Sequence, residues 1–311
     1  MPLGIRPTVD FAFKKIFGSP QNSVALIGLL NAILKLARPI VSVEILNPFS
    51  YQEFAESKLI VLDVRCQDSD DRWLNVEMQV SSFAGLIERL VYYACSMYVD
   101  QLSKGGNYAL ATPSISICLI SHLHFPDTPQ PHHRFQLLDK ASGREINNAI
   151  EVHTVELTKY HLSESTIEFS SRLEQWAFLL LRAQDYEAES LKRLLPGIEF
   201  ESAINSIATI SAKTEDKQMY DQREKAQRDD EWALSGAREQ GREQGREEGR
   251  EEGREEGREE GRKSAVAETV RMLEELAGKP LSPNQDLITQ TTSSLEMLVT
   301  QLQRQLRERQ A

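Results

Sequence analysis

The sequence predicts an α/β domain followed by an all-helical C-terminal extension. Two observations support this. Residues 58–80 contain two runs rich in β-branched residues, LIVLDVRC and RWLNVEMQV, separated by the polar turn QDSDD, which is typical of a β-hairpin. Strand-like and helix-period segments lie on both sides of this hairpin, whereas the composition changes abruptly after Lys213.

Two helices and a strand are expected before the hairpin. Residues 7–18 have apolar side chains at helical spacing, and Thr8 or Asp10 can cap the start of this helix. Residues 19–39 repeat apolar side chains at helical spacing after a Ser-Pro start. The alternation over residues 40–47 predicts a first strand.

The hairpin brings two carboxylates together. If its turn is centred on Asp70, facing residues have numbers that sum to 140, and Asp63 lies opposite Glu77. The other face is apolar and consists of Leu62, Val64, Cys66, Leu74, Val76 and Met78. Opposed carboxylates repel each other unless a cation lies between them, and Mg²⁺ accepts one or two carboxylates. Two interpretations follow, a divalent metal site or the solvated face of a half-exposed hairpin.

More helices and strands are expected after the hairpin. Residues 82–104 predict a long helix, and the β-branched run 114–121 predicts a strand buried on both faces. Further strands are expected at 135–138 and 150–157. Further helices are expected over 166–184 and, in shorter pieces, over 186–212.

Histidines and cysteines offer a second candidate for metal binding. Four of the six histidines fall within one short segment, and they are His122, His124, His132 and His133. Intervening prolines break any regular ligand spacing, which favours loop histidines over a zinc site. The three cysteines lie far apart without a C-x-x-C motif, which fits a reducing compartment. Without a signal peptide or a long apolar run, we expect a cytoplasmic protein with no membrane partner.

The C-terminal part contains an internal repeat. Glycine recurs at every fourth position from 241 to 261, in tetrads of Gly-Arg-Glu-Glu or Gly-Arg-Glu-Gln. This segment cannot bury a core, and we expect a helical or disordered spacer. Two amphipathic segments follow at 265–277 and 286–306. The second has a leucine stripe, Leu295, Leu298, Leu302 and Leu306, which predicts docking onto another helix, either in the same chain or in a second copy. Of these two, we expect a homo-oligomer formed through the C-terminal helices.

Several strings match a known family in order and spacing. They are VDFAFKKIFG at 9–18, NVEMQ at 75–79, Glu88-Arg89, Tyr92-Tyr93 and VELTK at 155–159. Together they resemble the Rpn family of recombination-promoting nucleases, which are transposase-like members of the PD-(D/E)XK nuclease superfamily. Asp63 with Glu77-Met78-Gln79 resembles the Asp…Glu-x-Lys signature in a Glu-x-Gln variant. The similarity extends over about residues 5–185.

The resemblance implies a restriction-endonuclease-like αβββαβ core with a mixed sheet, and the order of the expected elements agrees with it. We therefore expect four parts. They are a nuclease-like domain at 1–160, a helical extension packed on or near it at 161–212, the charged spacer at 213–263, and amphipathic helices at 264–311.

The resemblance also implies a site. Asp63, Glu77 and the backbone carbonyl of Met78 would hold Mg²⁺, or Mn²⁺ in its place, and Gln79 would orient the attacking water. An amide cannot supply the positive charge of the usual lysine. Lys14 or Lys15 would supply that charge, or both are solvated surface lysines.

Three further residues are auxiliary candidates. Asp10 is a helix cap or an additional acidic group of the site. Arg89 is a phosphate clamp or a surface arginine packed on a tyrosine, and Tyr92 shares its helix face.

Two functions are consistent with these features. The first is a metal-dependent DNA endonuclease that hydrolyses phosphodiester bonds, and the pair Asp63 and Glu77 favours it. The second is a catalytically lapsed nuclease scaffold that acts in protein interaction or self-association through its helical tail, and Gln79 favours it. Residues 1–135 hold 11 Lys+Arg and 12 Asp+Glu, out of totals of 36 and 47. We therefore expect DNA binding that is weak or salt-sensitive.

Overall fold

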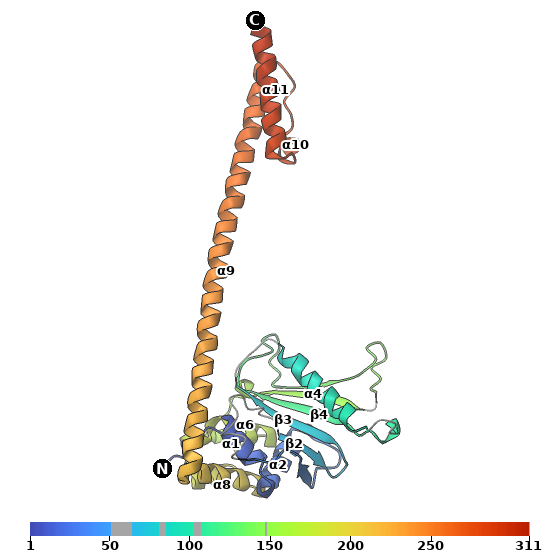
Figure 1. Ribbon diagram of the computed structural model, residues 1–311, viewed down its shortest axis with the longest axis vertical. Coiled ribbons are helices and arrows are strands. Elements are labelled where there is room, and N and C mark those ends of the chain that lie inside the picture. Colours follow the sequence, from blue (N-terminus) through green and yellow to red (C-terminus); the bar gives the residue numbers. More distant parts are fainter. Residues whose placement is uncertain (51–63, 81–84, 103–106, 147, 311) are drawn as a thin grey trace. The chain divides into compact units, whose positions relative to one another are not determined.

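The computed structural model describes residues 1–50, 64–80, 85–102, 107–146 and 148–310 (Figure 1). The chain divides into two compact units, Met1–Glu231 and Trp232–Ala311. Among the described residues, no helix has both the length and the apolar composition needed to span a bilayer.

Six strands of the described residues form one mixed sheet in unit Met1–Glu231, in the order β1-β2-β3-β4-β6-β5. The strands are β1 (Val43–Ile45), β2 (Val64–Asp68), β3 (Trp73–Gln79), β4 (Ser114–Ile120), β5 (His132–Gln136) and β6 (Ile150–Glu156). Strands β3, β4 and β6 are parallel to one another, whereas the β1–β2, β2–β3 and β5–β6 pairs are antiparallel. The predicted mixed α/β architecture is therefore confirmed.

The hairpin has the predicted register. Arg65 faces Asn75 and Cys66 faces Leu74, so the paired residue numbers sum to 140. The apolar face is buried as expected, at Val64, Cys66, Leu74, Val76 and Met78. Leu62 and Asp63 lie outside the described residues, so the pairing of Asp63 with Glu77 stays a prediction.

Helices cover both faces of the sheet (Figure 1). On the apolar face of the hairpin lie α1 (Asp10–Phe17), α2 (Ser23–Leu34), α6 (Arg172–Arg182) and α8 (Ile198–Ala212). The other face packs against α4 (Leu86–Asp100), whose Leu86, Leu90 and Ala94 contact Cys118, Ile120 and Val152. Every residue of β4 is buried because the strand is covered from both sides.

Shorter elements complete this unit. They are η1 (Pro20–Asn22), η2 (Tyr108–Leu110), η3 (Leu157–Lys159), α5 (Glu164–Ile167), η4 (Ala183–Asp185) and α7 (Ala188–Leu194). The expected helix over 166–184 is wrong as a single element, because Ser171 starts α6 with a capping box to Glu174. The expected cap of α1 is also wrong, since Val9 occupies the N-cap position and no side chain caps it.

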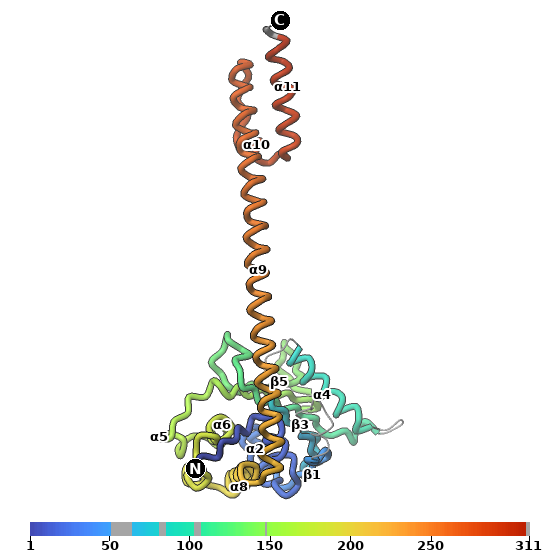
Figure 2. The backbone as a smooth tube through the Cα atoms, turned by 60° about the vertical axis from the view of Figure 1, so that its left-hand side comes forward, coloured from blue at the N-terminus to red at the C-terminus, as the bar shows by residue number. Residues whose placement is uncertain are grey.

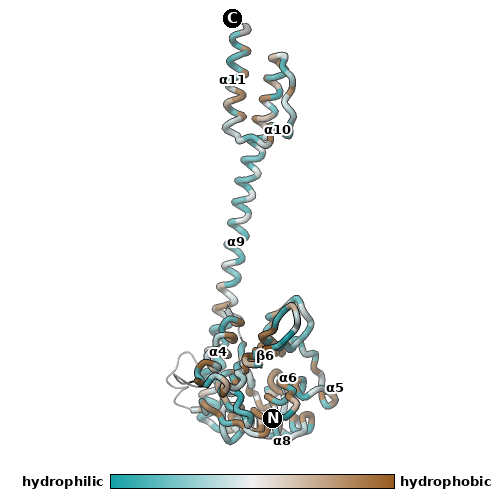
Figure 3. Tube along the Cα trace, turned by 90° about the vertical axis from the view of Figure 1, so that its right-hand side faces the viewer, coloured by the Kyte–Doolittle hydropathy of each residue, from teal (hydrophilic) through white to brown (hydrophobic). Residues whose placement is uncertain are grey.

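The charged repeat is helical, which is one of the two states expected for it. It forms part of α9 (Thr214–Leu276), whose middle is hydrophilic (Figure 3). In unit Trp232–Ala311, α10 (Asn284–Ile288) and α11 (Thr292–Gln310) lie beside the last turns of α9 (Figure 2). Ala267, Val270, Leu287, Leu295 and Leu302 form the core of this unit. Leu295 and Leu302 of the predicted stripe belong to this core and Leu298 packs against it, so the stripe docks onto a helix of the same chain.

Gly28 in α2 permits close packing of three helices. A Cβ atom at this position would lie 2.5 Å from the Cβ of Glu199 in α8 and 3.2 Å from Cζ2 of Trp176 in α6. Neither contact can be relieved by moving the far end of a flexible side chain. We therefore expect Gly28→Ala to lower the free energy of unfolding by about 1–3 kcal/mol, although alanine favours a helix by about 1 kcal/mol.

Urea denaturation of the full chain, followed by tryptophan fluorescence, measures this effect. Gly245→Ala is the matched control, because a Cβ atom there meets nothing within 4 Å. A Gly28→Ala protein as stable as the wild type would show that the helices separate without cost.

Candidate functional site

Glu77 is a buried carboxylate at the centre of the sheet. Side chains alternate along β3, so Asn75, Glu77 and Gln79 all lie on the face that α4 covers. Glu77 is 3% exposed, and its Oε1 accepts a hydrogen bond from Asn75 Nδ2 at 3.1 Å. Its Oε2 accepts one from Arg89 Nη2 at 3.0 Å. The interpretation of this face as solvated is therefore wrong at Glu77.

Arg89 joins Glu77 to Gln79. Its Nη2 also donates to Gln79 Oε1 at 2.8 Å, and its guanidinium lies 5.9 Å from the centre of the Tyr93 ring. The side chain of Arg89 is 35% exposed, so the pair with Glu77 is accessible to solvent from one side. The structure thus places Arg89 against a tyrosine and directs it to the predicted catalytic residues. Tyr92 is 67% exposed, and its ring lies 6.0 Å from that of Tyr93.

The oxygen atoms on this face suit a hard cation. Asn75 Oδ1 is buried and accepts no hydrogen bond from the residues that the structure describes. With the Glu77 carboxylate and Gln79 Oε1 it forms a row of hard oxygen donors, the type that Mg²⁺ and Mn²⁺ prefer. Within the described ranges, no group of three or more His, Cys, Asp or Glu residues could hold a metal ion. Asp63, the predicted second carboxylate, lies outside those ranges.

Met78 can contribute only through its backbone. Its side chain is buried in the core on the opposite face of β3. Ser121 N donates to the carbonyl of Gln79 at 3.0 Å, which therefore points toward β4. Because carbonyls alternate in direction along a strand, that of Met78 points away from β4, to the side of β2. This is the side on which the hairpin partner of β3 lies.

Cys118 lies next to Glu77 and is chemically inert. It pairs with Glu77 across the parallel strands β3 and β4. Burial raises the pKa of its thiol far above the usual range, and the negative charge of Glu77 raises it further. Burial likewise raises the pKa of Cys66 to about 12. Both thiols therefore stay protonated, and neither is a nucleophile.

The auxiliary residues of α1 have structural partners. Lys15 Nζ lies 2.5 Å from Asp216 Oδ2 in α9, and Lys14 is 2% exposed. Their interpretation as solvated surface lysines is therefore wrong. Asp10 is the first residue of α1 and binds the Arg223 guanidinium, with Nε 2.7 Å from its Oδ2. Its Oδ1 accepts from the backbone N of Phe11, but Asp10 does not cap the helix.

Two of the clustered histidines lie in a strand, so the loop assignment is wrong for His132 and His133. His132 Nε2 lies 2.9 Å from His153 Nδ1, and His153 Nε2 lies 3.1 Å from Glu151 Oε2. Arg134 binds both oxygens of Glu151, at 3.0 and 2.8 Å. These hydrogen-bonded side chains form a histidine chain on the face of the sheet opposite Glu77. His153 pairs with Ile117 and Ile117 with Val76, and the side chain of Val76 points to the face opposite that of its neighbour Glu77. Sequence reasoning missed it, since only strand register aligns His132 with His153.

The charges of this histidine chain are set by burial and by neighbours. Burial lowers the pKa of His132 to about 4, and electrostatic interactions with His153, Lys35, His133 and Arg134 lower it further. Burial alone would raise the pKa of Glu151, but hydrogen bonds from His153 and Arg134 lower it to about 2. At neutral pH the folded protein therefore holds a neutral His132 and an ionised Glu151, with His153 between them.

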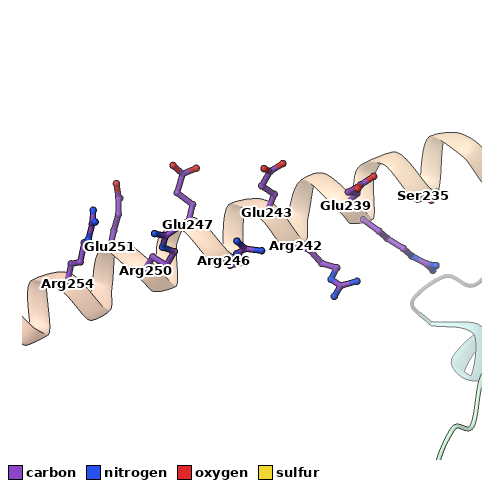
Figure 4. Close-up of a pocket in the computed structure, with 10 residues that line it drawn as sticks. Ser235, Glu239, Arg242, Glu243, Arg246, Glu247, Arg250, Glu251 and Arg254 are labelled. Atoms are coloured by element: carbon purple, nitrogen blue, oxygen red, sulfur yellow. The ribbon is translucent and has the colours of Figure 1, made fainter.

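A hollow along α9 is not a site (Figure 4). All of its lining residues, from Ser235 to Arg254, come from this one helix. Figure 4 shows the side chains of Glu243, Glu247 and Glu251 on one side of α9, with Arg242 and Arg246 directed elsewhere. A single helix cannot enclose a ligand, so the candidate site remains the one at Glu77.

The histidine chain makes stability depend on pH. The pKa of His132 is lower in the folded chain, about 4, than its ordinary value of about 6.5. The unfolded chain therefore binds more protons in this window, and stability falls as pH drops from about 6.5 to about 4. We expect His132→Gln to reduce this slope, measured by urea denaturation at several pH values. His161→Gln, at an exposed histidine, is the control. An unchanged slope in His132→Gln would contradict the assignment.

Comparison with known proteins identifies the family. A family model described as PD-(D/E)XK nuclease family transposase matches residues 7–237. The match begins before α1, includes the whole sheet with Glu77 and Arg89, and ends within α9. Searches of curated proteins and of solved structures found no match. Because the family model covers well over half of its length, this chain belongs to the PD-(D/E)XK nuclease family transposases.

Proposed function

We propose that this protein is a metal-dependent DNA endonuclease whose site lies between β3 and α4. The observation that carries this proposal is Glu77, a carboxylate that is 3% exposed and held by hydrogen bonds at both oxygens. Burying a carboxylate costs free energy, so a carboxylate buried in a sheet usually has a functional or structural role. Glu77 also resembles the glutamate of the Asp…Glu-x-Lys signature in the sequence, and it lies within the residues that the family model matches.

The neighbouring residues have distinct roles in this proposal. Asp63, Glu77 and the Met78 carbonyl would hold the cation, and Asn75 Nδ2 orients the Glu77 carboxylate. A bound Mg²⁺ or Mn²⁺ supplies positive charge to the scissile phosphate and acidifies a water. Gln79, whose Oε1 accepts from Arg89, would orient the attacking water. Lys15 and Asp10 would support the position of α1 through their partners Asp216 and Arg223 in α9, and Lys14 is buried beside them in α1.

We further equate α1, β1, β2, β3, α4 and β4 with the αβββαβ core of the superfamily, because they occur in that order among the described elements, with η1, α2 and η2 between them. The four-part division at residues 160, 212 and 263 stays part of this proposal. The first turns of α9 belong to unit Met1–Glu231, since Asp216 and Arg223 pair with α1.

A cleavage assay tests the proposal. Supercoiled plasmid is incubated at low salt with Mg²⁺, Mn²⁺, Ca²⁺ or EDTA. We expect nicking that needs Mg²⁺ or Mn²⁺ and falls by about 100-fold or more in Glu77→Gln and Asp63→Asn. Glu151→Gln is the matched control, because Glu151 is another buried carboxylate paired with an arginine in the same sheet.

The outcomes separate the two functions. Cleavage that survives Glu77→Gln and Asp63→Asn, or that persists in EDTA, discards the assigned site. A wild-type protein that neither cuts DNA nor binds Mn²⁺ supports the alternative of a lapsed scaffold. The observation favouring that alternative is Gln79, which stands where the signature has a lysine.

The C-terminal helices carry the proposal of a homo-oligomer. Leu295 and Leu302 are buried within the unit Trp232–Ala311, but Met272, Leu276 and Met297 are each more than 60% exposed. Burial of these side chains against a second copy would stabilise a dimer. We expect light scattering of the full chain to give a mass above that of one copy, and Leu276→Glu to lower it. A single-copy mass at all concentrations would discard the oligomer.

A further inference from the structure

One nitrogen atom of Arg89 connects Glu77, a proposed ligand of the cation, to Gln79, which would orient the attacking water. Nη2 lies 3.0 Å from Glu77 Oε2 and 2.8 Å from Gln79 Oε1. The Tyr93 ring, 5.9 Å from the guanidinium, supports its position with a cation–π contact. Arg89 therefore lies where the signature would place the positive end of a lysine.

This position conflicts with cation binding at Glu77. The Glu77 oxygen that accepts from Arg89 is an oxygen that a divalent cation would use as a ligand. The other oxygen already accepts from Asn75 Nδ2. Two cations at one carboxylate repel each other, and a buried pair is screened less than one in bulk water. Arg89 and a divalent cation thus compete for Glu77.

We propose that Arg89 gates the site by this competition and that DNA releases the gate. While no cation occupies the site, Arg89 would neutralise Glu77 through the ion pair that joins them. A phosphate of bound DNA offers the guanidinium a bidentate anionic partner on its exposed side. Moving to that phosphate, Arg89 leaves Glu77 to the cation and supplies the positive charge that Gln79 lacks. DNA and metal then strengthen each other's binding, as linkage requires.

This inference rests on the proposed nuclease function and assigns a regulatory role within the same site. It differs from a plain phosphate clamp in one respect that can be measured. Removing a clamp weakens DNA binding and leaves metal affinity unchanged. Removing the gate weakens DNA binding but strengthens metal binding, because Glu77 loses its competing cation.

The experiment uses the full chain and two readouts besides cleavage. Mn²⁺ affinity is measured by calorimetry without DNA, and affinity for a short labelled DNA duplex is measured by fluorescence anisotropy in EDTA. We expect Arg89→Met to bind Mn²⁺ about 10-fold more tightly than the wild type and DNA about 10-fold more weakly. Arg89→Lys keeps the charge and should fall between the two in both measurements.

Arg134→Met is the matched control, since Arg134 pairs with the buried Glu151 of the same sheet but on the opposite face. It should leave both affinities unchanged.

A folding defect in Arg89→Met would weaken both affinities, so tighter Mn²⁺ binding together with weaker DNA binding cannot arise from misfolding. Mn²⁺ binding that is equal or weaker in Arg89→Met overturns the gate. If the wild type still cuts DNA with Mn²⁺, the proposed function survives that result. A wild type and an Arg89→Met protein that both fail to bind Mn²⁺ and to cut DNA would overturn the two proposals together.

Discussion

The parallel pairing of β3 with β4 is the constraint on which the rest of this fold depends. Parallel neighbours need a long crossover connection, and here the crossover contains α4. The helix must pack on one face of the sheet, and that face carries Asn75, Glu77 and Gln79. The polar row is therefore buried and needs internal partners. Arg89 supplies one because it lies on the α4 face that meets the strand.

The local sequence pattern predicts the register of the hairpin but not the helix that covers its polar face. The two-residue period and the turn at Asp70 fix the register, which the structure confirms from Val64 to Val76. The same alternation is compatible with a solvated polar face, since it carries no information about a covering helix. The burial of Glu77 follows from α4, which reaches it only through the crossover. Asp63 lies outside the described residues, so its part in the site stays a prediction from the sequence.

Contacts between distant residues account for what sequence reasoning missed. His132 meets His153 because β5 and β6 pair in one register, and Lys15 meets Asp216 across some 200 positions of the chain. Nothing in the local spacing of these residues indicates their partners. The surface interpretation of Lys14 and Lys15 rests on the general preference of charged side chains for solvent, which their partners in this fold override. The start of a new helix at Ser171 is not visible in the apolar spacing, which continues through this position. It depends on the capping box that Ser171 forms with Glu174.

The inert thiol of Cys118 gives this protein a built-in reporter of motion. Cys118 faces α4 beside Glu77 and is fully buried, so an alkylating reagent reaches it only when the helix lifts from the sheet. The rate of its modification at high reagent concentration would therefore equal the rate of that local opening. Any event that loosens or tightens the cover of Glu77 can then be timed on a single sulfur atom, with no label added to the chain.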